Sequence, residues 1–321
     1  MKSFVIKIIC FLGIPFLLLL VIYIMADPFK TNNAFHLSEV NTINREYLST
    51  ELYLKNEKKL KYDSFIFGSS KACGINTYKW KSYLPAGSSQ FLFQAWAETI
   101  TGIYQKLAFL DKRNVAINNV VILLDIPASF GEIQEPTTAL AIKHPSLSGK
   151  SKLYFHGVLF YRFLKPSEVY KSIQSIFDKP KNKVDFDTIS NDWNRLNKLK
   201  LERMPKQDST LSKSKFGVRP EQLIRTKQLI EPELVVLLEN IKSILKKNQS
   251  NYKIVIVPSY NQLGINVQDL AILVKIFSKE NIFDYSGNHL FSKDKFNFSD
   301  INHFDMIIGW KILEDIYETP N

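Results

Sequence analysis

Two distant parts of the chain carry side chains that could do chemistry together. The serine pair Ser69 and Ser70 ends the run Asp63-Ser-Phe-Ile-Phe-Gly-Ser-Ser70, and Asp300 and His303 lie near the carboxyl end. A serine hydroxyl needs a base at hydrogen-bond distance to act as a nucleophile near neutral pH, and an imidazole oriented by a carboxylate is the usual base. Because Asp300 and His303 are so close in sequence, both can face one crevice. The pattern therefore predicts a hydrolase or acyltransferase site.

Ordinary structural roles compete with this hypothesis. Either serine could cap the free amide groups that begin a helix, and Ser69 rather than Ser70 could be the nucleophile. His303 could be a structural histidine, and His289, near Asp284 in the sequence, is the strongest competitor for its role. The other histidines have no partner at a suitable spacing: His36, His144 and His156.

The elements that would position these residues alternate as strands and helices. Apolar runs predict strands at 64–67, 91–93, 120–124 and 253–257, with a short apolar segment at 282–283. Helical patterns lie at 37–60, 97–110, 233–247, 267–278 and about 304–317. Strands separated by helices favour a parallel sheet with helices on both faces, in which ligands bind beyond the carboxyl ends of the strands. Ser70, Asp125 and Asp300 each follow a predicted strand or apolar segment.

The first residues predict a membrane anchor. The 19 residues from Ile8 to Ala26 carry no charge, and as a helix they would reach roughly 28 Å, close to the thickness of a bilayer core. Positive charges precede this run, which favours a cytoplasmic start and a body in the periplasm or outside the cell. A cleaved signal peptide is the rival interpretation. We expect a single-pass anchor in the cytoplasmic (inner) membrane at residues 1–27 and an extracytoplasmic domain at 28–321.

Composition limits the remaining possibilities. At 321 residues, 45% hydrophobic and 13% aromatic, the chain should form a packed globular body rather than a disordered polymer. The two cysteines, Cys10 and Cys73, give no disulfide framework and argue against zinc held by cysteine ligands. We expect neither a cofactor nor a metal.

The net charge of +11 is concentrated in one part of the chain. Residues 143–230 contain 19 Lys and Arg against 8 Asp and Glu, so the remainder is balanced. Prolines interrupt this segment, which we interpret as a basic insertion with short amphipathic helices at 168–177 and 193–201. The charge favours attraction to an anionic membrane face or an anionic surface polymer, and a merely solvated insertion is the alternative. No nucleic-acid motif accompanies the charge, so we expect no nucleic-acid partner.

The order of these features resembles the SGNH (GDSL-like) hydrolase superfamily, in particular its membrane-anchored DltD-like and alginate O-acetylation-like branch. Gly68-Ser69-Ser70 matches the first block of that family, and Asp300-Ile-Asn-His303 matches the last. The resemblance implies a flavodoxin-like three-layer α/β/α sandwich. It also implies Ser70 as the nucleophile, His303 as the base and Asp300 as the group that orients the imidazole.

The middle blocks of the family pattern differ here. In the family a Gly and an Asn donate hydrogen bonds to the oxyanion, whereas the matching region 94–98 lacks both and the third predicted strand ends in Asp125. The amide of Ser70 and the side chain of Gln94 are the candidate oxyanion donors. Losing one such donor typically costs about 10²–10³ in rate.

Together these features predict a serine-dependent enzyme, an esterase or transferase, that hydrolyses or transfers an O-acyl group on a cell-envelope polysaccharide. Acetyl is the acyl group that we favour. The expected partners are a cell-surface glycan or anionic polymer, the membrane, and a membrane-bound O-acyltransferase. The alternative is an accessory protein that keeps the fold and binds a glycan or such a transferase without catalysis. Three aromatic residues could stack on sugar rings or belong to the core: Trp96, Trp193 and Tyr260.

Overall fold

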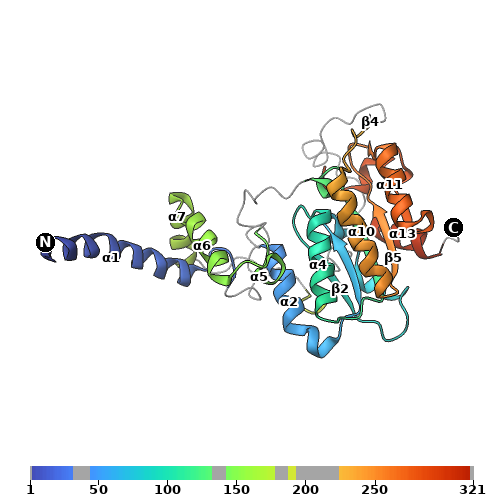
Figure 1. Cartoon of the computed structure of the whole chain (residues 1–321). Coiled ribbons are helices and arrows are strands. Elements are labelled where there is room, and N and C mark those ends of the chain that lie inside the picture. Colours follow the sequence, from blue (N-terminus) through green and yellow to red (C-terminus); the bar gives the residue numbers. More distant parts are fainter. Residues whose placement is uncertain (1, 32–43, 132–141, 178–186, 193–223, 319–321) are drawn as a thin grey trace. The chain divides into compact units, whose positions relative to one another are not determined.

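The computed structural model divides into two compact units (Figure 1), one comprising Met1–Leu48 with Glu135–Val184, the other Ser49–Gln134 with Asp185–Asn321. It describes the chain except residues 1, 32–43, 132–141, 178–186, 193–223 and 319–321. The division between the units crosses the basic segment 143–230. The helix predicted at 193–201 lies outside the described residues, as do the first residues of the helix predicted at 37–60.

The first unit is helical. Its helices are α1 (Lys2–Ala26), α5 (Pro145–Ser148), α6 (Lys152–Phe163) and α7 (Pro166–Phe177), and α2 (Arg45–Leu60) starts here and continues into the second unit. The helix predicted at 168–177 is thus confirmed as α7, whereas α6 was not predicted. The core of this unit consists of Tyr23, Phe29, Ile142, Phe155, Leu159 and Phe163.

The anchor predicted at residues 1–27 coincides with α1, which is helical over most of that range. Across the stretches that the structure describes, we find no helix with the length and apolar character needed to cross a membrane. The membrane anchor stays a prediction.

The second unit is an α/β domain built on a five-stranded sheet. The strands are β1 (Ser64–Gly68), β2 (Gln90–Gln94), β3 (Asn119–Leu124), β5 (Asn251–Ile256) and β7 (Ile282–Asp284). They are arranged in the order β2-β1-β3-β5-β7, and each neighbouring pair is parallel. A separate parallel pair joins β4 (Ile224–Arg225) to β6 (Leu263–Gly264). All four predicted strands and the apolar segment at 282–283 are therefore strands of one sheet.

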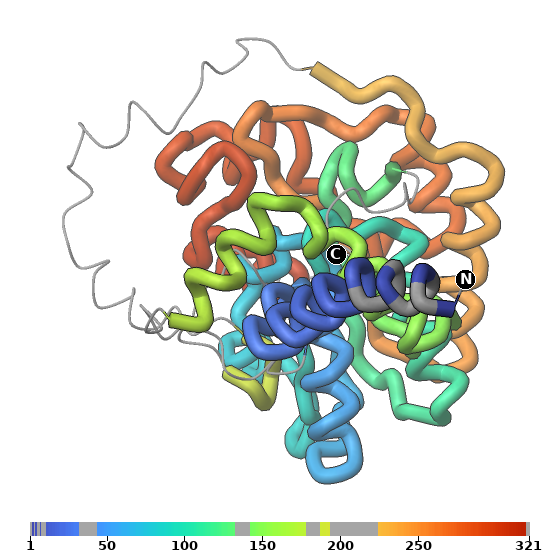
Figure 2. The backbone as a smooth tube through the Cα atoms, turned by 90° about the vertical axis from the view of Figure 1, so that its left-hand side faces the viewer, coloured from blue at the N-terminus to red at the C-terminus, as the bar shows by residue number. Residues whose placement is uncertain are grey.

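Alternate side chains of β1 enter two different cores, so the domain has three layers. Phe65 packs against Tyr53 of α2, and Phe67 packs against Phe93, whose ring stacks on Tyr53. This side of the sheet is covered by α4 (Ile100–Lys112) and α10 (Pro232–Lys247), which lie side by side in Figure 1. Ile66 faces the opposite way, into a cluster with Ala72, Trp80 and Ile312. Figure 2 traces the backbone of the chain from its N-terminus to its C-terminus.

The remaining helices extend these two outer layers. The layer on the Ile66 side consists of α3 (Thr77–Lys81) and α13 (Met306–Glu318) with a short 3₁₀ helix, η2 (Ser70–Gly74). On the other side, α11 (Val267–Phe277) packs near α10, and Phe277 contacts Tyr252 of β5. A short helix, α12 (Leu290–Lys293), follows β7.

Local signals explain where helix starts differ from the prediction. The helix predicted at 97–110 begins later, at Ile100, because Ala97 has a positive φ of 47° and the Thr99 hydroxyl caps the helix by accepting from the amide of Gly102. The helix predicted from 304 begins at Met306, because Phe304 forms an antiparallel bridge with Phe298. Both differences depend on backbone geometry that hydrophobic periodicity does not report.

Candidate active site

Ser70 lies just beyond the carboxyl end of β1, where Gly68 allows the chain to turn. Gly68 has a φ of +157°, and a Cβ at this position would lie 2.9 Å from Cβ of Leu123 on the neighbouring strand β3. A glycine is therefore required where β1 ends against β3. The chain then enters η2 at Ser70.

The two serines have different environments. Ser69 is buried, and its hydroxyl caps η2 by accepting from the amide of Lys71 at 3.3 Å. Ser70 is half-buried and directs its hydroxyl towards His303. The capping role that the sequence left open between the two residues thus belongs to Ser69, which leaves the hydroxyl of Ser70 for the crevice.

The structure brings Ser70, His303 and Asp300 into one hydrogen-bonded chain. Oγ of Ser70 lies 2.9 Å from Nε2 of His303, and Nδ1 of His303 lies 2.9 Å from each carboxylate oxygen of Asp300. When Nδ1 carries the proton and donates it to Asp300, Nε2 is free to accept the hydroxyl hydrogen of Ser70. This is the geometry that a serine nucleophile needs.

The carboxylate of Asp300 is held in its charged form. Burial raises the pKa of Asp300, but four other interactions lower it, and the net result is a pKa below the usual value. These interactions are hydrogen bonds from the ring of His303 and from the amide of Asn302, attraction to the imidazole, and a hydrogen bond from the amide of His303. The Asn302 and His303 amides donate to Oδ1 at 2.7 Å and 3.0 Å. The side chains of His303 and Asp300 remain 28% and 44% exposed, so the site is open to solvent.

The loop that carries Asp300 and His303 is closed by backbone contacts. Phe298 and Phe304 form an antiparallel bridge and are both buried in the core. Within the loop the amide of Ser299 donates to the carbonyl oxygen of His303 at 2.9 Å. The loop is therefore fixed at both ends to the packed interior, and this fixes the direction of the imidazole.

A close approach between η2 and α13 joins the two halves of the site. A Cβ on Gly309 of α13 would lie 2.0 Å from the carbonyl oxygen of Gly74, at the end of η2. A Cβ on Gly74 would lie 2.4 Å from the ring of Phe304. Because both positions lack a side chain, η2 and α13 can approach closely enough for Ser70 to meet His303. Sequence reasoning did not identify this pair.

An ion pair next to the serine was also missed. Nζ of Lys71 lies 2.5 Å from Oδ1 of Asp125, and Oγ of Ser69 lies 3.4 Å from Oδ2 of the same carboxylate. The side chains of Lys71 and Asp125 are only 10% and 16% exposed. The sequence left open whether Asp125 orients a site residue, and the structure pairs it with the turn that presents Ser70. The only signal for Lys71 was a charged residue directly after the serine pair.

Gln94, the second candidate oxyanion donor, lies at the carboxyl end of β2, in register with Gly68. Its side chain is buried, and its backbone carbonyl oxygen accepts a hydrogen bond from the hydroxyl of Ser49 at 2.8 Å. Its position is next to the turn that precedes Ser70. Its role towards an oxyanion stays a prediction.

The competing residues have structural environments. His289 caps α12 by accepting from the amide of Phe291, packs against Tyr285, and has its pKa lowered by burial. His144 is buried and caps α5, and Tyr260 belongs to the core. His36 and Trp193 lie outside the described residues. Of the histidines whose surroundings are described, His303 is the one in contact with Ser70.

No group of three or more His, Cys, Asp or Glu side chains suited to hold a metal ion occurs in the described part of the chain. Comparison of the sequence with models of protein families and with curated proteins gives no match.

Proposed function

We propose that the protein is a serine-dependent esterase or transferase that removes or transfers an O-acyl group on a cell-envelope polysaccharide. The favoured acyl group is acetyl. The observation that carries this proposal is the hydrogen-bonded chain from Ser70 through His303 to Asp300. Two parts of the sequence that lie far apart in the chain supply these three residues. Ser70 follows a strand, Asp300 and His303 lie in a loop, and both parts are at the same end of the sheet.

The reaction proceeds in two steps through an acyl-enzyme. Oγ of Ser70 attacks the acyl carbonyl carbon while Nε2 of His303 takes the hydroxyl proton, and the bond to the alcohol oxygen breaks as His303 returns that proton to the leaving group. In the second step water or a sugar hydroxyl gives its proton to Nε2 of His303 and attacks the acyl carbon, and the bond to Oγ of Ser70 breaks as His303 returns the proton to that oxygen. Asp300 keeps the imidazole in the required tautomer and stabilises its positive charge in both steps.

Donors for the oxyanion come from the turn and from β2 in this proposal. The amide of Ser70 is the first of η2, and the first amides of a helix have no acceptor within that helix. This leaves it available to a developing oxyanion, with the side chain of Gln94 as the second donor. Preorganised donors of this kind usually contribute the largest part of the stabilisation of such a transition state.

The fold supports the resemblance to SGNH hydrolases. Numbering only the strands of the large sheet along the chain, their order is 2-1-3-4-5, the order of flavodoxin-like doubly wound sheets. Sites in such sheets lie beyond the carboxyl ends of the strands, where Ser70 is found. A predicted anchor and extracytoplasmic body, together with a site open to solvent, favour a polymeric envelope substrate over a small cytoplasmic ester.

One observation favours the accessory function as the second candidate. The end of β3 presents the carboxylate of Asp125, held by Lys71 and Ser69, where the family resemblance implies an asparagine donor. A carboxylate cannot donate to an oxyanion. A protein with this feature could bind a glycan or a membrane-bound O-acyltransferase and use Ser70 weakly or not at all.

Trapping the acyl-enzyme separates these two functions. Membranes that contain the full-length protein would be incubated with 4-nitrophenyl acetate at mildly acidic pH and analysed by mass spectrometry. We expect an acetyl group on the peptide that contains Ser70 in the wild-type protein and in Ser82→Ala, which removes an exposed hydroxyl that is not part of the hydrogen-bonded chain of Ser70, His303 and Asp300. We expect none in Ser70→Ala. An unmodified wild-type protein that still binds envelope polysaccharide would instead support the accessory function.

A further inference from the structure

Helix α6 exposes large apolar side chains on the side opposite its buried face. Phe155, Leu159 and Phe163 recur every fourth residue and are buried in the core of the first unit. Leu153 and Tyr161, on the opposite side, are 84% and 76% exposed. A surface helix of a soluble protein normally turns a polar face to the solvent, and a helix that is apolar all round is typical of a buried or membrane environment.

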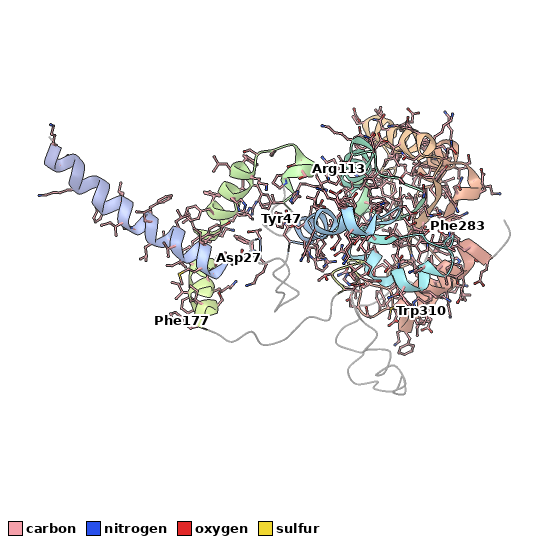
Figure 3. All side chains as sticks on the ribbon, turned by 90° about the horizontal axis from the view of Figure 1, so that it is seen from below. Asp27, Tyr47, Arg113, Phe177, Phe283 and Trp310 are labelled. Atoms are coloured by element: carbon pink, nitrogen blue, oxygen red, sulfur yellow. The ribbon has the colours of Figure 1, made fainter. Side chains whose placement is uncertain are left out.

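Helix α7 adds a second exposed apolar stripe. Tyr170, Ile173 and Phe177 are spaced three and four residues apart, which places them on one face of the helix. All three are exposed, and Phe177, labelled in Figure 3 at the end of α7, is 82% exposed. We call Leu153, Tyr161, Leu164, Tyr170, Ile173 and Phe177 the exposed stripe of α6 and α7.

This stripe belongs to the same unit as the apolar helix α1. Phe160 of α6 packs edge-on against both Phe16 and Tyr23 of α1, with ring centroids 5.6 Å and 5.4 Å apart. Helix α1 itself exposes large apolar side chains along its length, among them Phe11 and Leu17. Exposed apolar surface that extends over neighbouring helices marks a site for a protein or membrane partner.

The charges around the stripe indicate which partner fits. Residues 143–177 contain six Lys and Arg, at Lys143, Lys150, Lys152, Arg162, Lys165 and Lys171, and one acidic residue, Glu168. Helices that lie in a membrane interface combine an apolar face, aromatic residues at the level of the headgroups, and basic residues that attract anionic lipids. Tyr161 and Tyr170 supply such aromatic side chains beside Arg162 and Lys171.

We propose that α6 and α7 lie in the interface of an anionic lipid bilayer, with the exposed stripe at the boundary between the headgroups and the acyl chains and the basic side chains at the headgroups. The first unit then contacts the membrane through two elements, α1 and the α6–α7 pair. This inference rests on the membrane location included in the proposed function, and it is independent of any chemistry at Ser70.

Bilayer depth can be measured one side chain at a time in the full-length protein. Single cysteines at Tyr161→Cys or Phe177→Cys, in a Cys10→Ser, Cys73→Ala background, would be labelled with the environment-sensitive fluorophore NBD. The protein would be reconstituted into vesicles of phosphatidylethanolamine and phosphatidylglycerol, with or without brominated acyl chains. Tyr78→Cys is the matched control, because Tyr78 of the second unit is 76% exposed, as Tyr161 is.

We expect blue-shifted emission at both test positions and loss of fluorescence when the lipids carry bromine, with neither effect at Tyr78. Quenching by bromine that is no stronger at Tyr161 and Phe177 than at Tyr78 would overturn the inference. A blue shift that depends on protein density but not on bromine would assign the stripe to a second copy of the chain and overturn it as well. Labelling of Ser70 by a fluorophosphonate in the same samples reports separately on the proposed function.

Discussion

At the scale of single residues, the site depends on two adjacent serines with separate tasks. Ser69 is buried and satisfies the start of η2, while Ser70 meets the imidazole of His303. Ser69 also approaches Asp125, which is paired with Lys71, so the turn is fixed from behind by polar contacts. These contacts hold the turn that presents Ser70, and catalysis by preorganised groups requires such support.

The charge of Asp300 leads to a prediction about acid stability. The pKa of Asp300 is lower in the folded protein than in the unfolded chain, where it is about 4. Its charge therefore stabilises the fold fully at pH values above the unfolded pKa. This stabilisation is lost as the pH falls through the lower pKa of the folded protein. Asp300→Asn lacks the titrating group. Melting temperatures measured between neutral and strongly acidic pH should show wild type above Asp300→Asn at neutral pH, with the difference shrinking under acid. A difference that grows as the pH falls would contradict this assignment.

The ion pair beside Ser70 leads to a second prediction. Lys71→Met leaves the partly buried carboxylate of Asp125 without its cation, and loss of one partner of a fully buried pair, which is the upper bound here, typically costs about 3–5 kcal/mol. Urea unfolding of the full-length protein in detergent should show a loss of this size or somewhat less. The double variant Lys71→Met, Asp125→Leu should recover much of it, because no unpaired charge remains. A Lys71→Met variant as stable as wild type would show that the pair contributes little.

Residue types and spacing were enough to predict which side chains meet, but not what supports them. Ser70, Asp300 and His303 could be selected because their chemistry is specific and each follows a predicted strand or apolar segment. Lys71 could not, because its partner Asp125 is far away in sequence and only the packing of η2 against the end of β3 brings them together. The role of Gln94 as an oxyanion donor was predicted from its position alone and stays a prediction.

At the scale of elements, the contact between η2 and α13 sets the distance between nucleophile and base. A substitution there should move the two halves of the site apart without touching either catalytic side chain. Gly309→Ala places a methyl group 2.0 Å from the carbonyl oxygen of Gly74, and overpacking of this kind costs about 1–3 kcal/mol. We expect Gly309→Ala to unfold at lower urea and to react more slowly at Ser70.

Gly157→Ala is the matched control for this prediction. Gly157 also lies within a helix, α6, but a Cβ there has no atom within 4 Å. It should be neutral or stabilising by up to about 1 kcal/mol, because alanine favours the helix. Equal losses in the two variants would indicate a general helix effect rather than a clash between η2 and α13.

The strands could be predicted more closely than the helices, for a physical reason. A strand of a parallel sheet is buried on both faces and appears as a continuous apolar run, such as Val120–Leu124, which the structure extends by one residue to Asn119. Helix starts depend on caps and turns, such as the positive φ of Ala97. Helix α6 was missed because apolar residues such as Leu153 and Tyr161 also lie on its exposed side and obscure the helical spacing of its buried face.

At the scale of the whole molecule, the chain consists of a helical unit and an α/β unit that carries the site. The sequence indicated the α/β part through its alternation of strands and helices. It did not indicate that α6 belongs with the N-terminal helix α1, because that association depends on packing among Tyr23, Phe155 and Phe163. Contacts of this kind join residues remote in sequence and leave no local pattern.

The predicted anchor can be tested on the intact cell envelope. If α1 crosses the bilayer, the full-length protein should remain in the membrane pellet after extraction with alkaline carbonate and should dissolve only in detergent. A protease added to intact spheroplasts should digest the body, because the predicted orientation places it outside the cytoplasm. Release by carbonate, or protection from protease while a known external protein is digested, would contradict the prediction.

The measurement that tests the central claim most directly is covalent labelling of the full-length protein with a fluorophosphonate probe, with the modified residue identified by mass spectrometry. An activated serine should be labelled at Ser70. Labelling should be absent in Ser70→Ala and His303→Ala, and slower by about 10⁴-fold in Asp300→Asn, where the tautomer of the imidazole is no longer fixed. A folded wild-type protein that takes up no label, or that is labelled equally well without His303, would contradict the claim that Ser70 is activated by His303 and Asp300.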